Sequence, residues 1–293
     1  MRADVFPQAN LLNLAHRIQP QAGELGNAKI HRGTVRSRLQ RSFDVSGIVN
    51  IGSHARGTAI RRFSDLDMLV VLRRNQAKWG GDLISSSTVL RKVIEDLQER
   101  FPLTEVGRDG QAAVVWFGAS QQSLDVVPAL FNRMENLRPV YLIPDGRGGW
   151  METSPAAHDR YFDLADVRSK GKLRKLSQLI KWWKFSRAEP IPIMTFHVDM
   201  LMAANDLCAG VKPYTVCLYQ AFKLLADREC RGLHDPCKVA GTIYAAQTDP
   251  QWRNVCDAVN YALEHATAAV AAEAAKNFRE ANRQWEIVFN GEI

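Results

Sequence analysis

The sequence lacks the features that mark membrane, secreted and repeat proteins. No run of apolar residues approaches the ~20 that a helix needs to cross a bilayer. The N-terminus has no uninterrupted apolar core followed by a small-residue cleavage site, so we predict no secretory signal. We find no internal repeat, and the clearest biased tract is the Ala-rich HATAAVAAEAAK, which favours helix. We therefore expect a cytoplasmic protein that does not bind membranes.

Cysteine is also scarce. The five cysteines all lie in the last third of the chain, at Cys208, Cys217, Cys230, Cys237 and Cys256. An odd number in a cytoplasmic protein argues against a disulfide framework. Cys230, His234 and Cys237 have a spacing that zinc could use, and the alternative is that the cysteines are small buried hydrophobic residues. The sequence leaves this choice open.

Composition and charge indicate a globular protein with an affinity for polyanions. Apolar residues make up 46% and charged residues 24% of the 293 positions, which favours two domains or one large bilobal unit. The net charge of +7 comes entirely from residues 1 to 62, which hold ten Lys or Arg and three acidic residues. This segment suits nucleotides or nucleic acid, and the alternative is a solvated helix face.

Hydrophobic periodicity predicts a mixed sheet followed by a helical block. Helices are expected at 8–19, 21–43 and 83–100, and strands at 47–51, 65–72, 112–117, 123–127 and 138–143. A turn around Gly118 to Gln122 should join two of these strands. Later helices are expected at 170–186, 194–209, 214–227 and 250–285. This order predicts two lobes, residues 1–168 and 169–293, with the active site in a cleft between them.

The stretch from Val49 to Leu72, VNIGSHARGTAIRRFSDLDMLVVL, carries the clearest chemical signal. Asp65 and Asp67 are two residues apart on a predicted strand, so both side chains point to one face. Two carboxylates at the edge of an apolar strand are costly to bury unpaired. Because carboxylate oxygens suit Mg²⁺ or Mn²⁺, the pattern predicts a divalent cation at this position.

Two further features extend this site. Gly52 and Ser53 fall where a strand turns into a helix, where glycine permits close backbone approach and free N–H groups can bind a phosphate. Asp125 lies on a strand that could run alongside the first. Three carboxylates can hold two metals, an arrangement used for in-line displacement at phosphorus.

At this point the sequence becomes recognisable. GSHARGTAIRRFSDLDMLVVL followed by LDVVPAL resembles the nucleotidyltransferase signature of the polymerase-beta-like superfamily. Within it, the chain is similar to the bacterial cGAS/DncV-like nucleotidyltransferases (CD-NTases), relatives of cyclic GMP-AMP synthase and oligoadenylate synthase. YLIPDGRGGWMETSPAAH, LSQLIKWWK, TDPQWRNV and the terminal WEIVF extend the likeness over most of the chain. The resemblance implies an α+β, bilobal fold with a nucleotidyltransferase core and a helical C-terminal lobe.

The resemblance also implies roles for individual residues of the core. Asp65, Asp67 and Asp125 would be catalytic and would hold two Mg²⁺ ions, or Mn²⁺ in their place. Asp125 would in addition favour deprotonation of the acceptor hydroxyl. Gly52 and Ser53 would hold the donor phosphates.

Three residues of the helical lobe receive implied roles in nucleotide binding. Lys181 matches a lysine that contacts the triphosphate in these relatives, and the alternative is an ordinary surface lysine. Thr195 and Phe196 fall where the family supplies a polar contact and an aromatic surface for a base. Many relatives have serine where Thr195 stands, and Phe196 could instead belong to the core.

The implied reaction joins nucleoside triphosphates, ATP expected among them, by attack of a ribose hydroxyl on an α-phosphate with release of pyrophosphate. The cyclic product would be a second messenger of antiphage defence (CBASS), acting on an effector that responds to the product rather than binding the enzyme. One alternative is a nucleotidyltransferase acting on an RNA end, a protein or a small-molecule acceptor. Another is a nucleic-acid sensor or inactive scaffold, but few aromatic residues interleave the basic ones, so activation by nucleic acid is the minor hypothesis.

Overall fold

The computed structural model describes residues 6–118 and 123–293 and divides into two compact units. Residues 20–159 form one, which we call the sheet unit. The chain up to residue 19 joins residues 160–293 in the other, the helical unit. The structure thus places the boundary at 159/160 rather than 168/169, and the first helix belongs with the C-terminal helices. Most of the turn expected around Gly118 to Gln122 lies outside the described residues.

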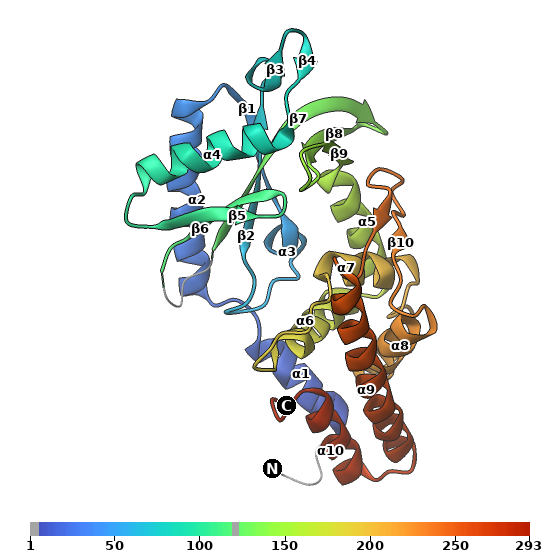
Figure 1. Cartoon of the computed structure of the whole chain (residues 1–293). Coiled ribbons are helices and arrows are strands. Elements are labelled where there is room, and N and C mark those ends of the chain that lie inside the picture. The colour runs from blue at the N-terminus through green and yellow to red at the C-terminus, as the bar shows by residue number, and fades with distance from the viewer. Residues whose placement is uncertain (1–5, 119–122) are drawn as a thin grey trace. The chain divides into compact units, whose positions relative to one another are not determined.

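The described part of the sheet unit combines a mixed set of strands with three α-helices and a short 3-10 helix (Figure 1). Its elements are α2 (Ala22–Ser42), β1 (Val45–Ile51), α3 (Gly52–Arg56), β2 (Leu66–Leu72), the 3-10 helix η1 (Arg74–Ala77), β3 (Lys78–Trp79), β4 (Asp82–Leu83), α4 (Ser86–Arg100), β5 (Glu105–Asp109), β6 (Ala112–Trp116), β7 (Leu124–Glu135), β8 (Arg138–Pro144) and β9 (Trp150–Thr153). The helix α5 (Pro155–Arg168) continues from this unit into the helical one.

The main sheet is mixed. Its strand order is β1-β2-β7-β6-β5, with β8 pairing β7 and β9. Only the β2–β7 pair is parallel among the described strands, and the remaining pairs are antiparallel. This one parallel pair brings the motif strand and the strand of Asp125 side by side, as expected.

The two faces of the sheet have different roles because β-strand side chains alternate. Even-numbered residues of β2 and β7 point toward α2 and α4 and form the larger hydrophobic core with Val35, Leu39, Leu90 and Val93. Odd-numbered residues of the same strands point to the other face, where Leu69, Val127 and Tyr141 belong to a smaller cluster. Asp67 and Asp125 are odd-numbered, so they lie at one end of this second face.

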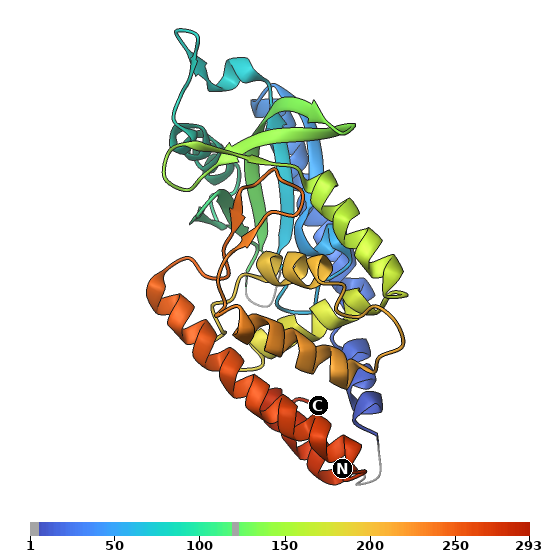
Figure 2. The same ribbon diagram turned by 90° about the vertical axis from the view of Figure 1, so that its right-hand side faces the viewer.

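The helical unit contains the remaining elements. These are α1 (Pro7–Arg17), α6 (Lys172–Phe185), α7 (Thr195–Ala204), α8 (Tyr214–Asp227), the short pair β10 (Leu233–His234) and β11 (Thr242–Ile243), α9 (Asp249–Ala274) and α10 (Phe278–Val288). Figure 2 shows α9 and α10 side by side. The single helix predicted over 250–285 is wrong, because the chain reverses between them.

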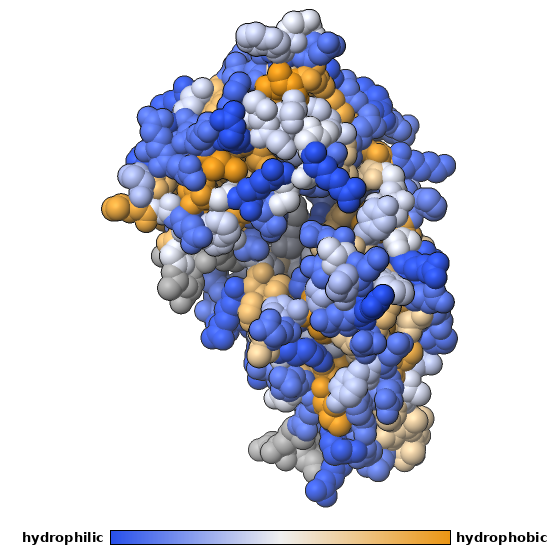
Figure 3. All heavy atoms as spheres, in the orientation of Figure 1, coloured by the Kyte–Doolittle hydropathy of each residue, from blue (hydrophilic) through white to orange (hydrophobic). Residues whose placement is uncertain are grey.

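In the face drawn in Figure 3, hydrophobic residues form small patches among hydrophilic ones. Of the helices in the described part of the chain, none has the length and apolar character needed to span a bilayer.

Candidate active site

The register of β2 and β7 sets the central geometry. In this parallel pair Asp67 lies directly opposite Asp125. On the other side of β2, Ile51 at the end of β1 lies opposite Asp67. Three neighbouring strands therefore bring the end of β1 and both carboxylates to one point of the sheet.

Gly52 begins α3 directly after β1 and lies against the Asp67 carboxylate. Its φ of +74° is in the region that favours glycine. A Cβ added at this position would lie 1.9 Å from Asp67 Oδ2 and 2.4 Å from Asp67 Cγ. Glycine is required here both by the backbone conformation and by this close approach. Ser53 follows it in the first turn of α3 and is half-buried.

Asp65 precedes β2 by one residue and is exposed. Ser123 Oγ donates a hydrogen bond of 2.5 Å to Asp65 Oδ1. The backbone of Ser123 is engaged as well, because Leu66 N donates to Ser123 O at 3.0 Å. Ser123, just before β7, thus holds Asp65, just before β2, in place.

Asp125 is perturbed by its surroundings. Burial, followed by the charges of Asp67, Asp65 and Asp109, raises the pKa of Asp125 to about 8. Burial and nearby like charges both destabilise the ionised form, so near neutral pH Asp125 retains its proton unless a cation joins the group. Asp109, at the end of β5, is an additional acidic neighbour that the sequence analysis did not identify.

These residues fit a divalent cation. Asp65, Asp67 and Asp125 offer hard oxygen donors. A bound metal ion would offset the two causes of the raised pKa of Asp125, its burial and the repulsion from its acidic neighbours. When bound, such ions stabilise the negative charge that develops at a reacting phosphate.

The residues expected to bind nucleotide from the helical lobe lie in the helical unit. Lys181 on α6 is 3% exposed, and its Nζ lies 3.2 Å from Oδ2 of the fully buried Asp199 on α7. Ser177 Oγ donates to the other oxygen of Asp199. Lys181 is therefore not an ordinary surface lysine. Thr195 and Phe196 form the first turn of α7, and both are half-buried.

Cys230, His234 and Cys237 lie in different surroundings. Cys230 is buried with its thiol against Cys256, whereas His234 is exposed. In the parts of the chain that the structure describes, no metal-ligating group unites Cys230, His234 and Cys237.

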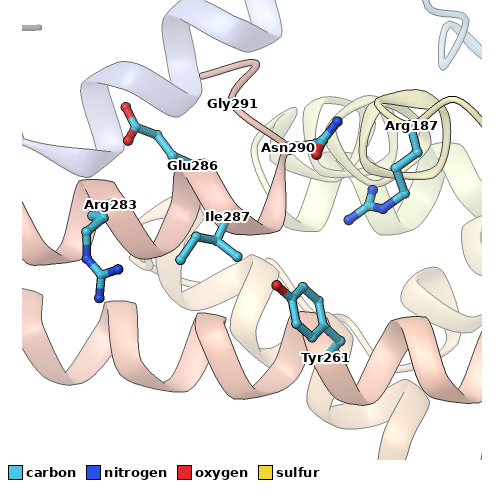
Figure 4. Close-up of a pocket in the computed structure, with 7 residues that line it drawn as sticks. All are labelled: Arg187, Tyr261, Arg283, Glu286, Ile287, Asn290 and Gly291. Atoms are coloured by element: carbon cyan, nitrogen blue, oxygen red, sulfur yellow. The ribbon is translucent and has the colours of Figure 1, made fainter.

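Figure 4 shows a shallow pocket elsewhere in the helical unit. Its volume is about 420 Å³, and it is lined by Arg187, Tyr261, Arg283, Glu286, Ile287, Asn290 and Gly291. Arg187 donates to the carbonyls of Trp183 and Val288, and Arg283 pairs with Glu280. Both guanidinium groups therefore already have partners within the chain.

Comparison with known proteins identifies the family. The model of the Second Messenger Oligonucleotide or Dinucleotide Synthetase domain matches residues 7–163. The chain belongs to this family. It is a nucleotidyltransferase that makes a second messenger from nucleoside triphosphates, and the family uses divalent metal ions.

Individual relatives agree with this assignment. A probable cyclic nucleotide synthase of Bacillus cereus (strain VD146) is 22% identical over 275 residues, covering 84% of this chain and 82% of the relative. The cyclic AMP-AMP-AMP synthase of Escherichia coli (strain MS 115-1) is 26% identical over 196 residues, covering 64% and 59%. The structure of E. coli MS115-1 CdnC with ATP matches with a TM-score of 0.74 at 18% identity over 99% of both chains. The predicted family, fold class and reaction class are thus confirmed.

The structure brings together the predicted residues of the sheet unit and adds residues that the sequence analysis missed. Gly52, Asp67 and Asp125 lie together as expected. Ser123 was missed because nothing in a sequence links it to Asp65, 58 positions away. Asp199 was missed because its partner Lys181 lies on a different helix.

Proposed function

We propose that this chain is a cyclic oligonucleotide synthase that uses two Mg²⁺ ions, with Mn²⁺ as a substitute, and ATP as one of its substrates. The observation that carries the proposal is the pairing of Asp67 with Asp125 across the only parallel strand pair described, with Asp65 held close by. Three carboxylates in this arrangement suit in-line displacement at phosphorus. The relative named as a cyclic AMP-AMP-AMP synthase and the relative solved with ATP support an adenine nucleotide.

The residues of the sheet unit would have different roles in the reaction. Asp65, Asp67 and Asp125 would hold the ions, which supply charge stabilisation at the α-phosphate and its pyrophosphate leaving group. Asp125, whose carboxylate holds a proton readily, would in its ionised form assist loss of the proton from the attacking ribose hydroxyl. Gly52 leaves room beside Asp67, and Ser53 adds a hydroxyl donor for the phosphates.

The residues of the helical unit would bind the nucleotide. We assign Lys181 to the triphosphate, Thr195 to a polar contact and Phe196 to the face of a base. Lys181 is preorganised by its ion pair with Asp199, which limits the conformations that its side chain must give up on binding. The product would signal to an effector of antiphage defence that responds to the product rather than to the enzyme.

The proposal is tested by incubation with the four α-labelled nucleoside triphosphates and Mg²⁺. We expect a phosphatase-resistant product that requires metal and includes adenine. The doubly substituted Asp65→Ala, Asp67→Ala protein should fold but form no product, whereas Asp82→Ala, which removes an exposed aspartate on β4, should retain activity. Label transferred to added RNA or to protein would instead favour the alternative acceptor, and absence of any metal-dependent product would contradict the proposal.

A further inference from the structure

Ser123 contacts the site without being one of its acidic residues. Its side chain is 8% exposed, and Asp65, to which it donates, is exposed. Because an ionised carboxylate only accepts hydrogen bonds, the hydroxyl proton of Ser123 must lie toward Asp65. At 2.5 Å from oxygen to oxygen the bond is in the range of charge-assisted O–H···O⁻ pairs, which are about twice as strong as neutral ones.

Asp65 depends on such a bond more than its neighbours do. Asp67 is inside β2, where the strand and the backbone of Gly52 limit its side chain. Asp125 is inside β7 and lies between strands on both sides. Asp65 stands one residue outside β2, so the strand restrains it less. The hydrogen bond from Ser123 supplies the restraint that the sheet does not.

We propose that Ser123 is a positioning residue that holds the Asp65 carboxylate in the orientation that binds the metal. The bond from Ser123 engages Oδ1, and we assign Oδ2 to the cation. This inference rests on the proposed metal-binding role of Asp65. Groups that hydrogen-bond to a ligating carboxylate orient it, and their loss typically weakens metal binding by about 10- to 100-fold.

The test is a titration of metal binding in the absence of nucleotide, in which Mn²⁺ is added to the full-length protein at one temperature and the heat of binding is measured. In Ser123→Ala the midpoint, the free Mn²⁺ concentration at half-saturation, should increase by about 10- to 100-fold. Ser123→Thr, which keeps the hydroxyl, should restore the midpoint. In the activity assay, saturating metal should return most of kcat to Ser123→Ala, because the defect lies in metal binding.

Ser154→Ala is the matched control. Ser154 is 1% exposed and lies in the same unit, and its hydroxyl donates a hydrogen bond of 2.8 Å to the backbone carbonyl of Pro139. The Ser154→Ala protein should have a lower melting temperature than wild type but bind Mn²⁺ with the wild-type midpoint. If Ser123→Ala does not fold, Ser123→Cys keeps the size of the side chain with only a weak donor and should show the same defect.

Two results would overturn the inference in different ways. If wild type and Ser123→Ala both bind Mn²⁺ with the same midpoint, Ser123 has no positioning role, although the metal site itself is supported. A wild-type protein that shows no binding of Mn²⁺ or Mg²⁺ would contradict the metal site itself, and the inference with it.

Discussion

Gly52 lies against the Asp67 carboxylate because no side chain stands between them. A Cβ at this position would meet Asp67 Oδ2 at 1.9 Å, so Gly52→Ala must displace the carboxylate or the backbone. We expect Gly52→Ala to lose about 100-fold or more in activity, since a shift of about 1 Å in a reacting group costs that much. It should also unfold about 1–2 kcal/mol more easily because of its positive φ.

The control for this substitution lies on the preceding strand. Gly47 in β1 has no positive φ, and no heavy atom lies within 4 Å of an added Cβ. Gly47→Ala should therefore keep near wild-type turnover. Equal activity in both variants, measured with the same nucleotides, would show that contact with Asp67 does not require glycine.

Asp125 makes the stability of the metal-free protein depend on pH. Its folded-state pKa of about 8 lies above the ordinary value of 3.8, so between these limits the folded state binds more protons than the unfolded state. Stability should then fall by at most about 1.4 kcal/mol per pH unit as pH rises through this window, and it should level off above it.

This prediction is checked by urea unfolding in EDTA across the window. Asp125→Asn should flatten the profile and be more stable than wild type near pH 8. Saturating Mg²⁺ should flatten the wild-type profile too, because the metal favours the ionised carboxylate. A metal-free wild-type protein that gains stability as pH rises through the same window would contradict the electrostatic account.

At the scale of elements, the ion pair between Lys181 and Asp199 joins α6 to α7. Both side chains are buried, and removing one partner of such a pair leaves a charge without compensation. Asp199→Ala should lower the free energy of unfolding by about 3–5 kcal/mol.

The double variant Lys181→Met, Asp199→Leu separates stability from binding. Because both charges are replaced by apolar groups, it should regain much of the stability lost by Asp199→Ala. It should nevertheless bind nucleoside triphosphates weakly, with a raised KM, if Lys181 contacts the phosphates. A wild-type KM in the double variant would show that Lys181 does not contact the nucleotide. An unchanged free energy of unfolding in Asp199→Ala, measured by chemical denaturation, would show that the ion pair does not stabilise the fold.

The predictable elements are those with strong local patterns. The spacing of Val35 and Leu39 indicated α2, and the apolar run after Asp67 indicated β2. β5 was missed because EVGRD is polar and buries only Val106, as befits an edge strand. β9 was missed because its four residues are all half-buried and lack alternation.

Two boundaries were misjudged for identifiable reasons. The strand carrying Asp125 continues past Pro128 to Glu135, because Pro128 falls between the residues of β7 that pair with β6 and those that pair with β8. The break between α9 and α10 could have been predicted from the sequence. Asn277 followed by Glu280 is a capping pattern, and the Asn277 side chain accepts from Glu280 N.

For the whole molecule, the sequence indicated the acidic ligands but not how they are held. Asp65, Asp67 and Asp125 could be identified because carboxylates beside apolar strands are costly to bury unpaired and therefore indicate a ligand. Ser123 and Asp199 act through hydrogen bonds between segments remote in sequence, so only the strand register and the helix packing reveal them. Long-range pairing is the part of the site that composition and spacing do not encode.

The basic N-terminal region should not be needed for catalysis. Lys29, Arg36 and Arg41 are exposed on α2, where physiological salt screens surface charges beyond about 8 Å. We expect Lys29→Glu, Arg36→Glu to keep wild-type turnover, and added RNA or duplex DNA to leave wild-type turnover unchanged. Stimulation by nucleic acid that the charge reversal abolishes would instead support activation through this face.

The central claim is that this chain closes nucleotides into a ring, and the ratio of pyrophosphate to product tests it most directly. A ring releases one pyrophosphate for each nucleotide it contains, and its mass shows no terminal phosphate. A linear product releases one fewer and keeps a 5′-triphosphate. We predict the cyclic ratio and mass for wild type with Mg²⁺, and neither pyrophosphate nor product for Asp67→Asn. A product that retains its triphosphate at completion, or equal turnover by Asp67→Asn, would contradict the account.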